Sequence, residues 1–84
     1  MLFVNLLLLR FAGFYYRYPM KIQVNGQSYE TPDGTTVREL VARHNLTPEK
    51  VAVELNRRLL KTEKYDQVLK EGDEVEIVTF VGGG

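Results

Sequence analysis

Apolar and polar positions alternate along the chain from residue 20 onward and predict a small sheet. Residues 20–25 alternate with a period of two, which is typical of a strand with one buried face. Asn25-Gly26 comes next, and this pair favours a tight hairpin because both residues tolerate a positive φ. We therefore expect a returning strand over residues 27–31, closed by a turn at residues 32–34.

A single main helix is predicted after this turn. Thr36 and Glu39 have the spacing of a capping box, in which each side chain binds the backbone N–H of the other residue. Four residues at helical spacing form one apolar stripe, namely Val37, Leu40, Val41 and His44. Asn45 suits the left-handed conformation that often ends a helix. A helix of about two turns depends on packing against the sheet for its stability.

The second half of the chain predicts three more strands. They cover residues 51–55, 58–60 and 74–80, with a turn at Asn56-Arg57 between the first two. Single helical turns are expected before the first of these strands and after the second. The order is therefore β-β-α-β-β-β. We expect an α+β fold in which one main helix packs on one face of a mixed five-stranded sheet.

Composition divides the chain at Met20. The 84 residues include 11 basic and 11 acidic side chains and no cysteine. Residues 1–19 hold 14 apolar residues, two arginines and no acid, whereas residues 20–84 hold nine basic and 11 acidic residues, a net charge of −2. We interpret residues 1–19 as an extension, residues 20–80 as the folded domain and residues 81–84 as a flexible glycine tail.

The extension is apolar but matches neither a membrane span nor a signal peptide. Asn5, Arg10 and Arg17 interrupt it, whereas a transmembrane helix needs roughly 20 mostly apolar residues. No positive charge precedes its apolar run, and aromatic residues occupy the place of the small residues at a cleavage site. Three interpretations remain open. The extension is disordered sequence upstream of a true start at Met20, a tail that binds a membrane surface or a partner, or a signal or anchor.

The charge balance and the absence of cysteine exclude several kinds of site. Without cysteine the chain has no disulfide framework, no thiolate zinc site and no side chain that carries sulfur as a persulfide or thioester. A balanced charge argues against a general nucleic-acid binder, which needs clustered lysine and arginine. His44 is the only histidine and has no second ligand at metal spacing, so we expect it to be structural and expect no metal site.

Three consecutive glycines, Gly82, Gly83 and Gly84, follow the last predicted strand. One explanation is a frayed end. The strand runs into them without a polar linker, however, and a tail without Cβ atoms is thin enough to enter a narrow channel. The carboxylate of Gly84 would then be reachable by another enzyme, for adenylation and attack by a sulfur nucleophile. The side chains that such chemistry needs are absent here, so a partner must supply them.

These features together resemble the ThiS family, the sulfur carriers of thiamine biosynthesis in the ubiquitin-like β-grasp superfamily. The resemblance covers residues 20–84 and rests on motifs in a fixed order, namely residues 20–26, Thr35-Thr36-Val37, residues 51–56, Gly72-Asp73-Glu74-Val75 and residues 80–84. The chain departs from the family in its N-terminal extension. It also departs at Arg57, where glycine is usual, and this predicts a changed or strained turn.

The resemblance implies a cofactor-free carrier rather than an enzyme. An E1-like adenylyltransferase of the ThiF type would use ATP and Mg²⁺ to adenylate Gly84. Sulfur from a cysteine desulfurase would convert it to a thiocarboxylate, and a thiazole synthase of the ThiG type would accept that sulfur. Gly82 and Gly83 would thread the partner's site. The implied setting is cytoplasmic, without nucleic-acid or membrane partners.

Other functions remain open alongside this one. Related carriers with the same chemistry form the small subunit of molybdopterin synthase or serve tRNA thiolation or cysteine synthesis. A ubiquitin-like modifier would instead join its terminal carboxylate to lysines. An inert β-grasp interaction module would make no use of its glycines.

Strand parity predicts a docking face for the partner. Glu76, Val78 and Phe80 share one parity, so they should lie on the sheet face opposite the helix. An exposed Phe80, four residues before Gly84, would contact a partner while the tail enters its site. The alternative is that Phe80 caps the edge of the core. Three acidic residues, Glu54, Glu74 and Glu76, would attract a basic partner. The alternative for each one alone is an ordinary solvated charge.

Overall fold

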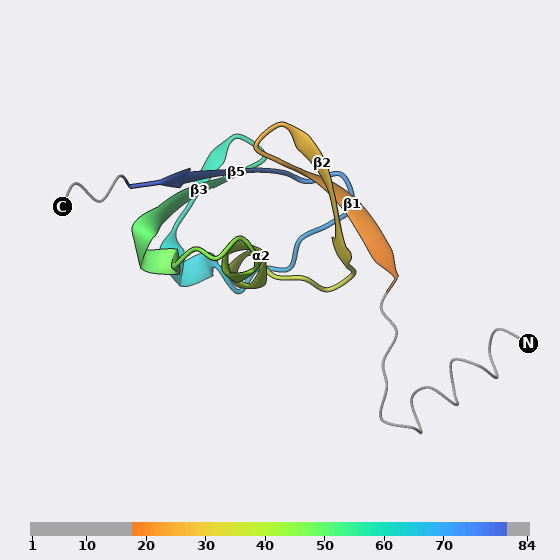
Figure 1. Cartoon of the computed structure of the whole chain (residues 1–84), viewed down its shortest axis with the longest axis horizontal. Coiled ribbons are helices and arrows are strands. Elements are labelled where there is room, and N and C mark those ends of the chain that lie inside the picture. Colours follow the sequence, from red (N-terminus) through yellow and green to blue (C-terminus); the bar gives the residue numbers. More distant parts are fainter. Residues whose placement is uncertain (1–17, 81–84) are drawn as a thin grey trace, which may run out of the picture.

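One five-stranded sheet and one α-helix dominate residues 18–80, the part of the chain that the computed structural model describes (Figure 1). The elements in order are β1 (Pro19–Val24), β2 (Gln27–Pro32), α2 (Val37–Arg43), the 3₁₀ turn η1 (Pro48–Lys50), β3 (Val51–Leu55), β4 (Arg58–Leu60), the 3₁₀ turn η2 (Thr62–Lys64) and β5 (Glu74–Thr79). Both predicted single turns are present, as 3₁₀ helices. The predicted α+β class with one main helix is confirmed.

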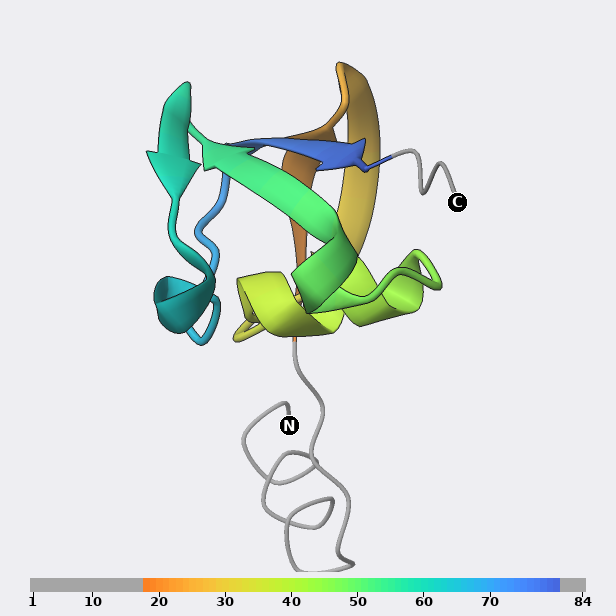
Figure 2. The same cartoon turned by 90° about the vertical axis from the view of Figure 1, so that its left-hand side faces the viewer.

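The first and last strands lie side by side in the sheet. The strand order is β2-β1-β5-β3-β4. β1 pairs with β5 in parallel, whereas the β1–β2, β3–β4 and β3–β5 pairs are antiparallel, so the sheet is mixed. Figure 2 shows α2 against one face of this sheet, and within residues 18–80 the opposite face carries no helix. The strand that leads to the glycine tail is therefore central and has a neighbour on each side.

The two hairpins have the same kind of turn. Asn25 and Gly26 have φ values of 52° and 82°, and Asn56 and Arg57 have φ values of 53° and 70°. Two positive φ values in a two-residue loop are those of a type I′ turn, which matches the twist of the paired strands. The turn type is therefore unchanged at Arg57, and of the two predicted outcomes, a changed turn or a strained one, the structure shows the strained turn. Arg57 holds a left-handed conformation that is unfavourable for a residue with a Cβ atom.

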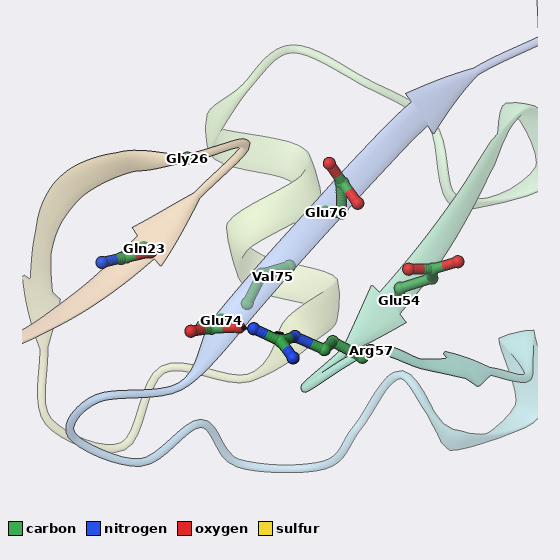
Figure 3. Close-up of a pocket in the computed structure, with 7 residues that line it drawn as sticks. All are labelled: Gln23, Gly26, Glu54, Arg57, Glu74, Val75 and Glu76. Carbon is green, nitrogen blue, oxygen red and sulfur yellow. Dashed lines mark ion pairs between the residues drawn. The ribbon is translucent and has the colours of Figure 1, made fainter.

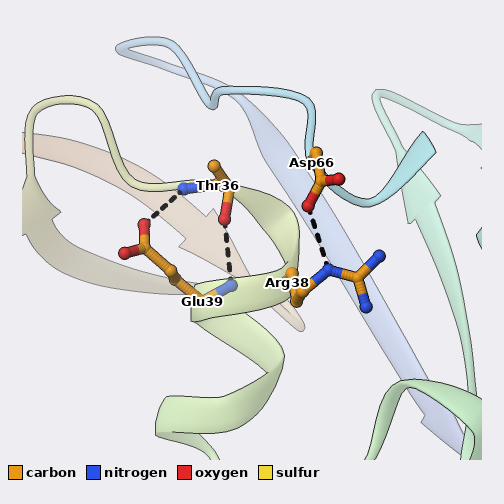
Figure 4. Close-up of polar contacts among 4 residues, drawn as sticks. All are labelled: Thr36, Arg38, Glu39 and Asp66. Carbon is orange, nitrogen blue, oxygen red and sulfur yellow. Dashed lines mark hydrogen bonds and ion pairs between the residues drawn. The ribbon is translucent and has the colours of Figure 1, made fainter.

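The predicted capping box begins α2 (Figure 4). The Thr36 N–H donates to Glu39 Oε1 at 2.9 Å, and the Glu39 N–H donates to Thr36 Oγ1 at 3.1 Å. Arg38, on the same first turn, forms an ion pair with Asp66 at 3.0 Å between Nε and Oδ1. Asn45 follows the helix with a φ of 60°, as predicted. Side-chain hydrogen bonds thus fix where the helix starts and join it to the segment after η2.

The core lies between α2 and the inner face of the sheet. Val37, Leu40 and Val41 of the predicted stripe are fully buried against inward-facing strand residues such as Ile22 and Val53. The segment between β4 and β5 adds two buried side chains that the apolar pattern did not predict, Tyr65 and Leu69. Helix, sheet and this irregular segment together close the core.

Four strand boundaries differ from the prediction by one residue, namely both ends of β1, the end of β2 at Pro32 and the end of β5. β1 begins at Pro19, which pairs with Pro32, so the sheet takes in the last residue assigned to the extension. Proline is tolerated there because the first residue of a strand does not have to donate to the ladder. β5 ends at Thr79 rather than Phe80, although the Phe80 N–H still donates to the Lys50 carbonyl at 3.0 Å.

Candidate functional site

β5 separates its side chains between the two faces of the sheet. Val75 and Ile77 point into the core, whereas Glu76 is exposed on the other face. Val78 is 57% exposed and Phe80 is 58% exposed. Phe80 is not part of the buried core, so the structure does not favour the alternative that it caps the core edge. The three residues of the predicted docking face are all accessible to a partner.

Neighbouring strands extend this face into an outer patch, which we define as Ala52, Leu59, Val78 and Phe80. Ala52 lies directly opposite Val78 in the β3–β5 register. Leu59 comes from β4 and is 70% exposed. An open groove of about 370 Å³ is lined in part by Ala52, Leu59 and Phe80. The apolar pattern did not reveal Leu59, because a strand of three residues is too short to show an alternation.

Acidic side chains lie beside the outer patch. Glu54 on β3 is directly opposite Glu76 on the neighbouring strand β5. On its other neighbour, β4, Glu54 is directly opposite Leu59. Figure 3 shows both carboxylates on the same side of the sheet, with α2 behind it. They border a hollow of about 270 Å³ that is also lined by Gln23, Gly26, Arg57, Glu74 and Val75. The outer face therefore combines apolar and acidic surface.

Arg57 compensates only part of this negative charge. Its Nε lies 3.6 Å from Glu74 Oε1 (Figure 3). Within residues 18–80, Glu54 and Glu76 have no ion-pair partner. Two uncompensated carboxylates on one exposed face attract cationic groups, and such charges raise the association rate with a basic partner.

The three predicted tail residues, Gly82, Gly83 and Gly84, lie outside the described residues. Phe80 is the last described residue before them. The outer patch is thus the described surface that is nearest to the tail along the chain.

His44 makes contacts that fit a structural role. Its Nδ1 lies 2.9 Å from the Leu40 carbonyl oxygen, and its ring centroid lies 5.2 Å from that of Tyr29. Among residues 18–80, no group of three or more histidine, cysteine, aspartate or glutamate residues is arranged to hold a metal ion. Within the same range, no helix has the length and apolar character to span a bilayer.

The profile of the ThiS family matches residues 22–84 of this chain. The chain belongs to the ThiS family. Its match to the sulfur carrier protein ThiS of Bacillus subtilis is 38% identical over 65 residues, which is 75% of this chain and 98% of that protein. The family resemblance inferred from the sequence motifs is thereby confirmed.

A solved ThiS structure has the same fold. The crystal structure of the thiamine biosynthesis protein ThiS from Geobacter metallireducens superposes with a TM-score of 0.66 and is 36% identical in sequence. The match covers 77% of this chain and 100% of that one. The predicted ubiquitin-like β-grasp fold is confirmed on this basis.

Two other relatives of this ThiS-family chain are larger proteins. A thiazole synthase of Magnetococcus marinus is 42% identical over 66 residues, which is 77% of this chain but 20% of that protein. A thiazole synthase of Paramagnetospirillum magneticum is 38% identical over 66 residues, again 20% of its length. The chain thus spans about a fifth of these thiazole synthases, each of which contains a segment similar to this chain.

Proposed function

We propose that this ThiS-family chain is a sulfur carrier of thiamine biosynthesis whose Gly84 becomes a thiocarboxylate. The observation that carries the proposal is the match to the Bacillus subtilis sulfur carrier, which extends over 98% of that protein. The family match includes the three terminal glycines, because it runs to residue 84. The chain acts as a co-substrate of its partners rather than as an enzyme, and it needs no bound cofactor.

The proposed reaction takes place at the carboxylate of Gly84. A ThiF-type adenylyltransferase uses ATP and Mg²⁺, so that a carboxylate oxygen attacks the α-phosphate and pyrophosphate leaves. The terminal sulfur of a persulfide on a cysteine desulfurase then attacks the acyl carbon and AMP leaves, which gives an acyl disulfide. A thiol reductant cleaves the S–S bond of this disulfide and releases the thiocarboxylate. Gly82 and Gly83 place this carboxylate in the partner's active site, since residues without Cβ atoms fit a narrow channel.

The outer patch is the proposed docking surface for these partners. Val78 and Phe80 supply exposed apolar area, and Glu76 lies on the same strand and the same face. Exposed aromatic and aliphatic side chains in a contiguous patch are typical of protein–protein interfaces. A ThiG-type thiazole synthase is one proposed occupant, because two thiazole synthases contain a segment similar to this chain.

An intact-mass measurement tests the proposal. The chain is incubated with ATP, Mg²⁺, its adenylyltransferase, a cysteine desulfurase, cysteine and a thiol reductant. We expect the mass increase of one oxygen-to-sulfur exchange, located at Gly84 by fragmentation. A matched variant without Gly84 should show no exchange. An unchanged mass of the full chain under these conditions would contradict the proposal.

Related carriers share these first steps, so a second measurement identifies the pathway. Loss of the gene should create a requirement for the thiazole precursor of thiamine. A requirement for molybdopterin or a loss of thiolated tRNA would instead point to a related carrier. Conjugates of the chain with lysine side chains in cell extract would indicate a ubiquitin-like modifier. The proposed setting of the reaction is the cytoplasm.

A further inference from the structure

Two asparagines occupy equivalent positions on either side of β5. Asn25 is the first residue of the turn between β1 and β2, and Asn56 is the first residue of the turn between β3 and β4. Their φ values are 52° and 53°. β1 and β3 are the two neighbours of β5, so each asparagine lies where one neighbouring strand ends beside β5.

Asn56 continues the antiparallel pairing of β3 with β5 by one residue. Leu55 pairs with Val75, so the next pair would be Asn56 with Glu74. The Asn56 N–H donates to the Glu74 carbonyl at 2.7 Å, as the ladder requires. The Glu74 N–H, however, donates to the side-chain oxygen Oδ1 of Asn56, at 2.9 Å. The side-chain amide thus replaces the backbone carbonyl as the ladder acceptor.

Asn25 does the same in the parallel pairing of β1 with β5. Val24 pairs with Val75, so the next pair would be Asn25 with Glu76. A parallel ladder then joins the Asn25 N–H to the carbonyl of residue 75 and the N–H of residue 77 to an acceptor on Asn25. The first of these bonds is present at 2.9 Å. The second is made by Asn25 Oδ1, which accepts from the Ile77 N–H at 2.7 Å.

Asn56 also connects this contact to the loop before β5. Its Nδ2 donates to Asp73 Oδ1 at 3.0 Å, and Asp73 Oδ2 accepts from the Lys70 N–H at 2.8 Å. Gly72 in this loop has a φ of 84°, which favours glycine. The point at which the chain enters β5 is therefore fixed by side-chain hydrogen bonds.

We propose that Asn25 and Asn56 are positioning residues that set the register of β5 and thereby the reach of the glycine tail. The pairing of β1 with β5 covers only two residue pairs, Gln23 with Glu74 and Val24 with Val75. The asparagine contact adds a hydrogen bond beyond this short ladder. A shift of one residue along a strand moves everything beyond it by about 3.3 Å.

The asparagines select among registers of β5 that its pattern of buried and exposed residues does not distinguish. A shift by one residue is prevented by burial, because it would expose Val75 and Ile77 and bury Glu76. A shift by two residues keeps each side chain on its own face, so burial opposes it less. Such a shift would break the bonds from both asparagine side chains to the Glu74 and Ile77 N–H groups. It would also displace the tail relative to Ala52 and Leu59, the members of the outer patch that lie on β3 and β4.

The effect on catalysis rests on the proposed function. A partner that contacts Ala52 and Leu59 on the neighbouring strands receives the Gly84 carboxylate at a distance that the β5 register determines. Misplacement of a reacting group by about 1 Å is enough to cost about 100-fold in rate. We therefore expect a loosened register to lower the kcat of adenylation more than it raises the KM.

The test compares glycine substitutions at three asparagines of the full chain. Asn25→Gly and Asn56→Gly keep the positive φ without strain and remove the side-chain amide, which in Asn56 includes the Nδ2 bond to Asp73. Asn45→Gly is the matched control, since Asn45 has a φ of 60° and its side chain makes no hydrogen bond to β5. Asn25→Asp is the conservative variant, because aspartate keeps an acceptor oxygen and tolerates the left-handed conformation.

Two readouts are measured on each variant. Hydrogen exchange of the Ile77 and Glu74 amides measures how stable the asparagine contacts are. The kcat and KM of pyrophosphate release with the adenylyltransferase measure how well the tail places Gly84 for the reaction. We expect Asn25→Gly to accelerate exchange at Ile77 about 10-fold, from the net worth of one hydrogen bond, and to lower kcat about 10-fold with KM nearly unchanged. Asn56→Gly should accelerate exchange at Glu74 and lower kcat to a similar extent. Compared with Asn25→Gly, Asn25→Asp should restore most of the amide protection at Ile77 and most of kcat.

Amide exchange equal to that of Asn45→Gly in both variants would overturn the proposal. So would accelerated exchange with an unchanged kcat, because register would then not affect the reach of the tail. If the unmodified chain is not adenylated at all, the proposed function fails instead. In that case the exchange rates and the cross-strand proton contacts between Leu55 and Val75 still decide whether the asparagines set the register.

Discussion

Glu54 on β3 lies directly opposite Glu76 on β5, on the exposed face of the sheet. Like charges at directly opposed positions destabilise a sheet. We take the size of this effect from favourable cross-strand pairs, which contribute roughly 0.2–1 kcal/mol each. Neither carboxylate has an ion-pair partner within residues 18–80. A basic partner surface that binds beside the outer patch would reduce the repulsion between these two carboxylates.

We expect Glu76→Gln to stabilise the chain and weaken its reaction with the adenylyltransferase. Removal of the repulsion should raise the free energy of unfolding by about 0.5 kcal/mol, measured by urea denaturation. The kcat/KM of adenylation should fall, and its dependence on salt should become weaker. Glu30→Gln is the matched control, because Glu30 lies opposite Lys21 and loses an attraction instead. Equal destabilisation by both substitutions would contradict this interpretation.

Arg57→Gly should stabilise the chain despite the loss of an ion pair. Arg57 has a φ of 70°, which costs a residue with a Cβ atom about 1 kcal/mol or more. Its side chain is 87% exposed, so the contact with Glu74 contributes little. After the greater flexibility of glycine in the unfolded chain is subtracted, we expect a gain of about 0.5 kcal/mol.

The same substitution one residue later is the control for Arg57. Arg58 is the first residue of β4, and glycine weakens a strand. Arg58→Gly should therefore lower the free energy of unfolding, by about 0.5–1 kcal/mol. Thermal denaturation of both variants distinguishes a conformational effect from a loss of charge, because each variant loses one arginine. A destabilised Arg57→Gly variant would show that the ion pair outweighs the strain.

Phe80→Ala should impair docking without affecting the fold. Phe80 is exposed and lies beyond the end of β5, so its truncation leaves the core intact. Loss of an interface aromatic typically costs about 1–2 kcal/mol of binding, so we expect the KM for the adenylyltransferase to rise about 10-fold. Val68→Ala is the control, since Val68 is 49% exposed but lies outside the outer patch. An unchanged KM in Phe80→Ala would remove Phe80 from the proposed interface.

Thr36→Ala should cost about 1 kcal/mol of stability, because it removes the capping hydrogen bond to the Glu39 N–H. Thr47→Ala is a suitable comparison. Thr47 precedes η1 in the same N-cap position but makes no side-chain capping bond. Chemical denaturation should show little change for Thr47→Ala. A similar loss in both variants would mean that the hydroxyl of Thr36 is not what stabilises the start of α2.

The sequence predicts the elements of this fold well, because their signals are local. The capping box, the Asn-Gly turn and the alternation in β5 each lie within a few residues of one another. Tyr65 and Leu69 were not predicted as core, because the segment between β4 and β5 has no regular period. Their burial depends on the closure of the fold around them.

In the candidate site, too, features set by neighbouring residues were predictable, whereas contacts between residues far apart in the chain were not. Strand parity is local, and it predicts that Glu76, Val78 and Phe80 share the exposed face. The repulsion between Glu54 and Glu76 depends on the register of two strands that are 18 residues apart in the chain. The role of Asn25 likewise depends on its bond to Ile77, 52 residues later. Such contacts follow only from the order of the strands.

The central position of β5 has a consequence for synthesis. Without β5 the sheet order β2-β1-β5-β3-β4 separates into two hairpins, which have no hydrogen bonds to each other. An isolated two-stranded hairpin is marginally stable at best in water. A ribosome completes β5 after every other element described here, so the growing chain cannot close its sheet early. Folding is thereby coupled to the synthesis of the strand that leads to the glycines, and an incomplete chain is left unfolded and open to proteolysis.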